Sequence, residues 1–291
     1  MNVQSKEIDE LIGTSENTEE QRSSIASAKR RRVQINVLRV LLLIVIFGGW
    51  ELGARTGIID PFFWGQPSSI WTQLITWVTQ GTAQGSLWEQ IAVTLEETVI
   101  GFLIGAVLGV VFGVVLGRNQ FLADVLSPFI KAVNAIPRVI LGPVFAIGLG
   151  LGIQSKIALS VVMVFFIVFF NAFQGVREVD RNLMANARIL GASQRQLSTS
   201  VIIPSALSWI IASLHTSFSF ALVGALVGEF LGATKGLGLV VQTAMSNFNN
   251  NGVFAGMFIM AAVALVAETL ITMLENRLLH WRPNVANDAT M

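Results

Sequence analysis

Long apolar runs that contain few charged residues recur along this chain and limit the folds open to it. Six runs follow one another after residue 36, at about 37–54, 91–116, 126–149, 156–172, 207–228 and 253–274. A helix of about 20 apolar residues crosses the hydrocarbon core of a bilayer, and lipid tolerates only helices or closed barrels as spanning structures. Charged residues make up 13% of the sequence, against about 25% in a typical soluble domain. The sequence therefore predicts an all-α integral membrane protein with six transmembrane helices, within a membrane domain over residues 37–280.

The two ends of the chain are polar. Residues 1–36 lack apolar periodicity and end in a basic cluster at 29–32, so we expect a disordered N-terminal tail; residues 281–291 form a second short tail. An apolar run behind basic residues also fits a signal peptide. The long polar leader, and the lack of a small-x-small cleavage site before Arg55, favour an uncleaved first span.

The Lys and Arg residues are distributed unevenly between the two sides of the membrane. Fifteen of the 19 fall on the side that both tails share, three fall on the other side and Arg138 lies within a span; the three are Arg55, Lys156 and Lys235. Cytoplasmic loops carry the excess of basic residues. The sequence thus predicts a multi-pass protein with both termini in the cytoplasm.

The segment between the first two spans carries four tryptophans, which favour the membrane interface. Ser68 and Ser69 are positioned to cap a short helix, on which Ile70, Leu74 and Trp77 share one face. We expect this helix to lie on the outer membrane surface.

The second span carries a glycine at every fourth residue, namely Gly101, Gly105, Gly109, Gly113 and Gly117. Such a stripe lets another helix approach closely. This spacing favours packing within the helix bundle, with a dimer contact as the alternative.

A polar, basic stretch from Asp180 to Pro204 separates the fourth and fifth spans. The pattern predicts a helix over residues 181–190, a turn at Gly191 and a second helix that Ser193 caps and Pro204 ends. The charge distribution places this stretch in the cytoplasm. It is either a solvated surface hairpin or a docking site for a partner that supplies energy.

Within this stretch, Ala187-Arg-Ile-Leu-Gly191-Ala192-Ser193, followed by Ile203-Pro204, resembles the cytoplasmic EAA loop of type I ABC importer permeases. Two positions differ, because Ala185 replaces the Glu of that pattern and Asn186 replaces its first Ala. Residues 91–280 also resemble the nitrate/sulfonate/taurine/bicarbonate branch of these permeases. That resemblance includes Pro128, Ala135-Ile136-Pro137, Gly148–Gly152, Val179-Asp180, Glu229-Phe-Leu-Gly and Gly236-Leu-Gly238.

The resemblance implies a permease subunit of an ATP-driven importer in the bacterial inner membrane. It implies cytoplasmic ATPase subunits that carry ATP and Mg, an external solute-binding protein, and a second permease copy in a homodimer. The chain itself would bind no cofactor and would not be an enzyme. Its coupling helix would lie between spans four and five, in a coupling loop with Ala185, Ala187, Arg188, Gly191, Ala192, Ser193 and Pro204.

Polar residues inside spans are functional candidates by default. Arg138, beside Asn134 and the break at Pro137, either lines the path of a small anion or pairs with Glu229 or Glu268. His215 and Ser219 in the fifth span either line the path or bond between helices. A sulfonate, taurine, nitrate or an organic acid would suit an arginine. Glu51, Glu96 and Glu97 lie near outer span ends, where we expect solvation at the interface.

Several kinds of site and partner are not predicted. The chain has no Cys and two His, so we expect no disulfide, no metal site and no catalytic residues; nothing indicates nucleic acid. Gly148–Gly152 lacks the strand–turn–helix setting of a dinucleotide loop and is interpreted as a tight turn. An ion-coupled secondary transporter or channel that uses Glu229 or Glu268 is the alternative function, and a membrane-embedded enzyme is disfavoured.

Overall fold

The computed structural model describes residues 30–178, 181–197, 199–200 and 203–278. Within that part of the chain, regular secondary structure is helical apart from an isolated β-bridge between Thr82 and Gly85, which confirms the predicted all-α class. Val179-Asp180, residues 1–29 and the C-terminal tail at 281–291 lie outside the described residues. The chain divides into two compact units at the boundary between Ser69 and Ile70.

The first unit contains a helix over residues 30–55 and the short helix α2 (Pro61–Trp64). Residues 30–36, expected in the polar tail, form the first turns of the long helix. Asp60 caps α2 by accepting a hydrogen bond from the Phe62 N–H at 2.9 Å. Pro61 follows at the first helical position, where its missing N–H is not needed.

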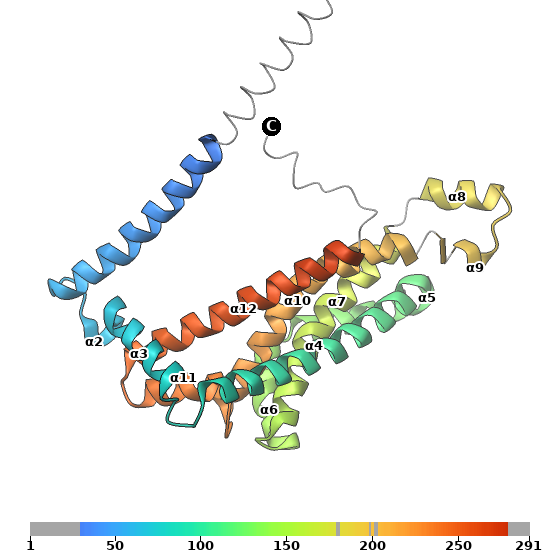
Figure 1. The fold of residues 1–291 in the computed structure, drawn as a ribbon. Helices are drawn as coiled ribbons and strands as arrows, with labels where there is room; N and C mark the ends of the chain where they lie inside the picture. The colour runs from blue at the N-terminus through green and yellow to red at the C-terminus, as the bar shows by residue number, and fades with distance from the viewer. Residues whose placement is uncertain (1–29, 179–180, 198, 201–202, 279–291) are drawn as a thin grey trace, which may run out of the picture. The chain divides into compact units, whose positions relative to one another are not determined.

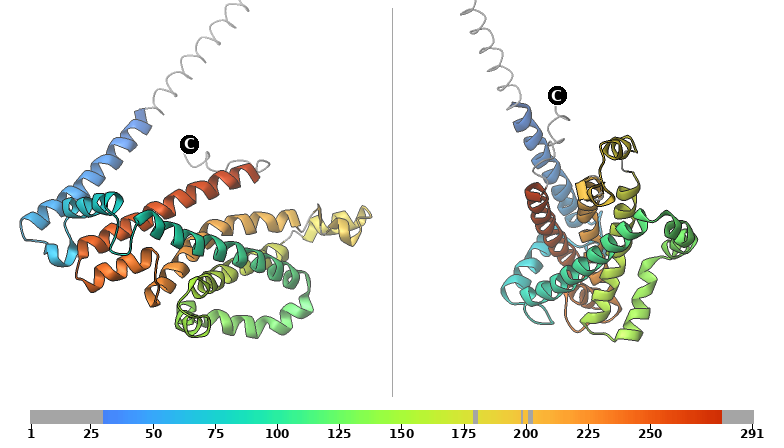
Figure 2. Two further views of the ribbon diagram at one scale, coloured as in Figure 1. Left: turned by 60° about the horizontal axis from the view of Figure 1, so that its bottom comes forward. Right: turned by 90° about the vertical axis from the view of Figure 1, so that its right-hand side faces the viewer.

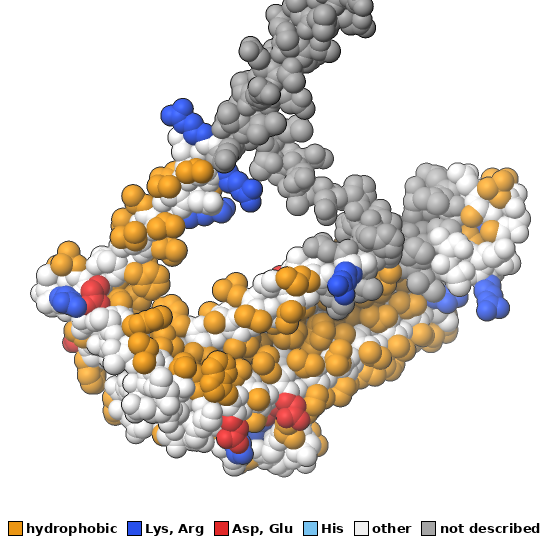
Figure 3. Space-filling view, in the orientation of Figure 1, with side chains coloured by type: hydrophobic (Ala, Val, Ile, Leu, Met, Phe, Trp, Pro, Cys, Tyr) orange, Lys and Arg blue, Asp and Glu red, His pale blue; other side chains and the backbone are white. Residues whose placement is uncertain are grey.

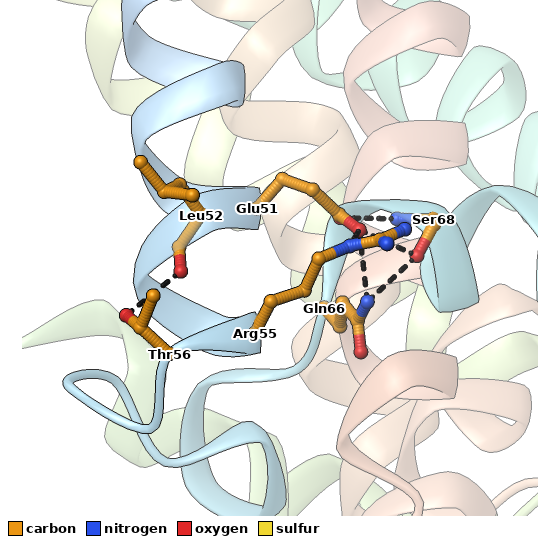
Figure 4. A network of polar contacts seen from close by, with 6 residues as sticks. All are labelled: Glu51, Leu52, Arg55, Thr56, Gln66 and Ser68. Carbon is orange, nitrogen blue, oxygen red and sulfur yellow. Dashed lines mark hydrogen bonds and ion pairs between the residues drawn. The ribbon is translucent and has the colours of Figure 1, made fainter.

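A carboxylate ties the end of the long helix to the start of α3 (Pro67–Thr79) (Figure 4). Glu51 accepts hydrogen bonds from Gln66 Nε2 at 2.8 Å and from the Ser68 N–H at 3.0 Å. Arg55 Nε lies 2.6 Å from the same carboxylate. α3 begins at Pro67, so Ser68 and Ser69 lie in its first turn. The prediction that one of them caps the helix is therefore wrong. The Glu51 carboxylate thus has these protein partners in addition to its predicted location near a span end.

The second unit is built around α7 (Ile153–Arg177), which α4 (Leu87–Arg118) and α10 (Ile203–Leu231) flank (Figures 1 and 2). The glycine stripe of α4 faces α7. A Cβ added at Gly105 would lie 2.8 Å from the Val164 Cβ, and one added at Gly109 would lie 2.8 Å from the Val168 Cβ. The remaining glycines of the stripe, Gly101, Gly113 and Gly117, meet α7 in the same way. The close approach is therefore a contact within one chain.

α7 also packs closely on α10, again at glycine positions. A Cβ at Gly228 of α10 would lie 2.9 Å from the Lys156 Cγ. Between the two contacts, Val164, Val168 and Ala221 form a fully buried core. Lipid provides no hydrophobic force between helices, so small residues that permit close van der Waals contact stabilise this three-helix centre.

The expected third span consists of α5 (Gln120–Ala135), the 3-10 turn η1 (Arg138–Ile140) and α6 (Leu141–Leu149), bent by 75°. The break falls at Pro137, because proline donates no N–H and disfavours a helical residue before it. A second break at Pro143, which a proline inside an apolar run would suggest, is absent, since Pro143 lies in the first turn of α6, where it is tolerated. Gly150, with φ of +80°, forms the tight turn to α7.

Residues 233–252 lie between the last two predicted spans and would form a loop on that prediction, but they contain the ten-residue helix α11 (Leu237–Ser246). The helix α12 (Asn250–Leu278) follows it, and α11 contacts α4, α10 and α12 (Figure 2). α11 was not predicted from the sequence, because glycines lie around its start and asparagines follow its end, and both residue types are typical of loops.

Five described helices are long and apolar enough to cross a membrane, or six if the bent pair is one span. Hydrophobic side chains cover much of the visible surface of the long helices (Figure 3). Exposed residues such as Leu103, Val107, Leu265 and Val266 belong to this surface. Such an apolar exterior fits contact with lipid.

Candidate functional site

The α8–α9 hairpin, which we define as residues 181–200, stands apart from the packed helices (Figure 1). It contains α8 (Arg181–Ile189) and α9 (Gln194–Leu197). Gly191 adopts φ of +84° just after α8, and the Ala192 N–H donates to the Ala187 carbonyl at 3.0 Å. The left-handed glycine ends α8 and reverses the chain. The predicted first helix and Gly191 turn are thus confirmed.

Ser193 caps α9 as predicted. Its Oγ accepts a hydrogen bond from the Gln196 N–H at 3.3 Å, while the Gln196 side chain accepts from the Ser193 N–H at 2.9 Å. This reciprocal pair is a capping box. Pro204 does not end the second helix, since α9 stops at Leu197 and Pro204 is the second residue of α10.

The surface of the hairpin combines exposed apolar side chains with a small hollow. Ile189 and Leu190 are 82% and 86% exposed, whereas Leu197 is buried. A hollow of about 310 Å³ is lined by residues of both helices and the turn, namely Ala187, Leu190, Gly191, Ala192, Gln196, Leu197 and Ser200. Ala185 and Arg188 are exposed beside it. Two fully exposed branched residues at a loop tip are the kind of surface that a partner protein covers.

Arg138 lies at the break of the bent helix pair. Its Nη2 donates to the Asn134 Oδ1 at 2.5 Å, and its guanidinium lies 5.0 Å from the centre of the Phe166 ring. Arg138 is half-buried and Asn134 is exposed. The alternative in which Arg138 pairs with Glu229 or Glu268 is wrong in this chain, because those carboxylates have other partners.

His215 of α10 and Glu268 of α12 form a pair across the bundle, with Nδ1 and Oε1 2.7 Å apart. The Glu268 side chain is 46% exposed and that of His215 is 23% exposed. A charged side chain inside a span faces protein or water instead of lipid. The open side of this pair is therefore turned toward an aqueous space or a further protein surface.

The hydroxyls of α10 divide into two groups. Ser213 and Ser217 are buried and donate to carbonyls of their own helix, those of Ile210 and Ser213. Thr216 and Ser219 are exposed on another face of the helix. The bonds of Ser213 and Ser217 are within one helix, so these two hydroxyls do not join α10 to a neighbouring helix.

Glu229 is fully buried, and so is Glu97, which the sequence placed in solvating surroundings at the interface. Glu229 accepts hydrogen bonds from Thr94 Oγ1 at 2.6 Å and from the Gly238 N–H. Interfacial solvation is wrong for Glu97, because α10 and α11 cover this side of α4. Lys156, expected on the outside, is also buried and donates to the carbonyls of Leu151 and Gly232.

No group of three or more His, Cys, Asp or Glu side chains that could hold a metal ion occurs among the described residues.

Comparison with known proteins identifies relatives of this chain. A family model described as "Binding-protein-dependent transport system inner membrane component" matches residues 101–280. The formylaminopyrimidine transport permease protein ThiX of Halalkalibacterium halodurans is 31% identical over 242 residues, which cover 83% of this chain and 93% of the relative. The putative aliphatic sulfonates transport permease protein SsuC of Bacillus subtilis is 30% identical, with 84% and 87% covered. The taurine transport system permease protein TauC of Escherichia coli is 28% identical, with 88% and 92% covered.

Two solved structures share the fold. The crystal structure of an amino acid ABC transporter with histidines matches with a TM-score of 0.52 and 20% identity, over 65% of this chain and 92% of that one. The inward-facing MetNI methionine ABC transporter matches with a TM-score of 0.51 and 22% identity, over 71% and 96%. At these identities the likeness concerns the fold alone.

Proposed function

This chain belongs to the family of binding-protein-dependent transport system inner membrane components, and from that premise we propose that it forms the membrane pathway for a small anionic solute. As a permease subunit of an ABC importer it is not itself an enzyme, since the ATPase is a separate subunit. The observation that carries the proposal is the family match over residues 101–280 together with a capped, glycine-turned hairpin between two apolar helices.

The α8–α9 hairpin is the surface that receives the ATP-binding subunit. Its exposed Ile189 and Leu190, and the hollow beside Gly191, provide apolar contact and shape. Ala185 offers no carboxylate at the position where the resembling pattern has Glu, so docking here depends on apolar burial and on Ala187, Arg188, Gly191, Ala192 and Ser193. ATP and Mg²⁺ belong to the partner, and this chain binds no cofactor.

The hairpin and both termini lie in the cytoplasm of a bacterial cell, with the chain in the inner membrane. The excess of Lys and Arg on that side supports this orientation. A solute-binding protein then delivers solute to the opposite side.

The pathway runs between two copies of the chain. Five polar residues of the proposed pathway are at least partly exposed in one copy, namely Asn134, Arg138, His215, Ser219 and Glu268. An exposed polar residue at membrane depth requires water or a partner, and a second copy related by a two-fold axis along the membrane normal supplies both. Glu229 is fully buried and does not line this surface.

Arg138 supports an anionic solute, because a guanidinium donates in parallel to carboxylate, sulfonate or nitrate oxygens. The relatives named for taurine and aliphatic sulfonates agree with a solute that carries an anionic group. The relative named for formylaminopyrimidine, and a further relative named as the riboflavin transport system permease protein RibX of Chloroflexus aurantiacus (32% identical), define the competing solute class. Closure of the ATPase pair brings the two hairpins together and opens the pathway outward, and ATP hydrolysis resets it.

Uptake by the purified complex in lipid vesicles tests this function. We expect uptake that requires ATP on the hairpin side and the binding protein on the other side. The trial solutes are an alkanesulfonate and nitrate, which are anions, and taurine, a zwitterion that carries an anionic sulfonate. Riboflavin and formylaminopyrimidine serve as neutral comparisons. Uptake driven by a proton gradient without the ATPase subunit would show an ion-coupled transporter instead, and ATP-dependent uptake of the neutral solutes alone would refute the anionic class.

A further inference from the structure

A cluster of buried ionisable residues joins four helices at a place that the proposed pathway does not use. We define the acid cluster as Glu97 of α4, Lys156 of α7 and Glu229 of α10, with the first amides of α11. The exposures of these three side chains are 2%, 1% and 0%. Burying three ionisable groups in a membrane protein is costly unless their charges are compensated.

Each oxygen of the Glu229 carboxylate accepts a hydrogen bond from a donor on α4 or α11. Thr94 Oγ1 donates to one carboxylate oxygen at 2.6 Å, and the Gly238 N–H donates to the other. Thr94 in turn accepts from the Leu237 N–H at 2.8 Å, and Gln90 Oε1 accepts from the Gly236 N–H at 2.8 Å. The otherwise unpaired N–H groups at the start of α11 are thus held by side chains of α4 and α10.

The two glycines at this junction leave room for the carboxylate. A Cβ at Gly236 would overlap the Glu229 carboxylate, and one at Gly238 would lie 2.7 Å from the Glu229 Cβ. Gly236 also has φ of +117°, which L side chains rarely adopt. The Gly-Leu-Gly sequence therefore fits Glu229 as an ionised acceptor at the N-terminus of α11.

Glu97 differs from Glu229 in its hydrogen bonding. It contacts Glu229 directly, but its Oε2 is buried without a hydrogen-bond partner. Lys156 does not satisfy that oxygen, since its Nζ donates to the carbonyls of Leu151 and Gly232 at 2.5 Å each. The Lys156 charge acts on both carboxyl groups from that anchored position. Glu96, exposed on the same helix, adds a further negative charge near Glu97.

Two ionised carboxylates in contact would repel each other strongly in a buried site. Burying an ionised oxygen without a donor also costs far more free energy than burying a neutral carbonyl oxygen. We propose that Glu97 is protonated and donates a hydrogen bond to the Glu229 carboxylate, so that a singly charged acid pair opposite Lys156 fastens α11 to α4 and α10. Glu97 is then a hydrogen-bond donor, and Glu229 is the one anion of the cluster.

Hydrogen–deuterium exchange of the full-length protein separates the two carboxyl roles. Glu229→Gln turns one of the two accepting oxygens into an amide donor, so either Thr94 or the Gly238 N–H loses its acceptor and the other loses a charged one. Exchange over residues 232–242 should therefore become about tenfold faster or more. Glu97→Gln keeps a neutral donor of the same shape and should exchange within about twofold of the unmodified protein. Glu96→Gln, on the neighbouring exposed position, is the matched control and should not accelerate exchange, because it removes only a nearby negative charge and no hydrogen bond of the cluster.

Infrared spectroscopy provides a readout that does not depend on the disrupted variant. The unmodified protein should show the carbonyl absorption of a buried protonated carboxylic acid, resistant to a rise in external pH, and Glu97→Gln should abolish it. The absence of that band, or a Glu97→Gln variant whose exchange is as fast as that of Glu229→Gln, would overturn the proposal, because either result means that Glu97 acts as an anion. These measurements require no transport and remain valid whatever solute the pathway carries.

Discussion

Gly109 of α4 lies against Val168 of α7, so that a Cβ placed on the glycine would stand 2.8 Å from the valine Cβ. The same added atom would lie 2.9 Å from the Phe165 carbonyl oxygen, a backbone atom that cannot rotate away. The contact belongs to a row of such glycines along α4, so the spacing of the two helices depends on the absence of side chains at these positions.

Gly109→Ala should therefore lower the stability of the folded chain by about 1–3 kcal/mol, the usual cost of overpacking. The reason is that α4 must move away from α7. Thermal unfolding of the purified protein in detergent measures the change. Gly148→Ala is the control, since nothing lies within 4 Å of an added Cβ there and it sits within α6. Equal stability of the two variants would contradict the close approach of α4 and α7.

Gly191→Val should reduce ATP-dependent uptake about tenfold while membrane insertion remains normal. Nothing in this chain lies within 4 Å of a Cβ at this position, so within the chain the substitution acts on the backbone, whose φ is +84°. The left-handed region costs an ordinary residue about 1–2 kcal/mol, and this cost displaces the turn of the α8–α9 hairpin. The measurement is uptake, together with ATPase activity, in vesicles that contain the complex.

Gly191→Asn is the matched variant for this test, because asparagine tolerates left-handed backbone. It should retain most of the uptake. If the valine variant transports normally, the hairpin turn has no part in coupling. If both variants fail equally, the position requires the absence of a side chain and not the backbone conformation.

Leu190→Ser should weaken association with the ATP-binding subunit without lowering the thermal stability of the isolated chain. Leu190 is 86% exposed, so its apolar area contributes only when a partner covers it, by about 1.5–3 kcal/mol. Co-purification and titration of the ATPase subunit measure this loss. Leu197→Ser is the contrast, since Leu197 is buried and its change should destabilise the hairpin itself. Unchanged association for Leu190→Ser would remove the apolar tip from the docking surface.

Arg138→Gln should lower uptake of an anionic solute several-fold with little loss of folded protein. The guanidinium bonds to Asn134 and stacks on Phe166, yet it is only half-buried and has no carboxylate partner to leave unpaired. Arg138→Lys keeps the charge but loses parallel donation, so an intermediate rate is expected for a planar anion. Solute uptake at varied concentration gives the comparison, and equal rates in all three proteins would make Arg138 a structural residue.

The amino-acid sequence was sufficient wherever the determining physics is local or periodic. Apolar runs long enough for a bilayer predicted the membrane helices, Pro137 predicted the break, and Gly191 and Ser193 predicted the hairpin, because each acts on its own stretch of backbone. The fourfold spacing of α4 glycines predicted a close helix contact. It did not identify α7 as the partner.

Only the tertiary structure decided the neighbours of each buried group. Glu97 looked like an interfacial residue because its burial depends on α10 and α11, which lie more than 100 residues along the chain. Glu268 contacts His215, and Arg138 contacts Asn134 and Phe166. The helix α11 was hidden by its flanking glycines and asparagines, since its first N–H groups are satisfied by Gln90, Thr94 and Glu229. Apart from α11, local sequence determines which segments become helices, whereas the electrostatic surroundings of a side chain depend on which helices pack around it.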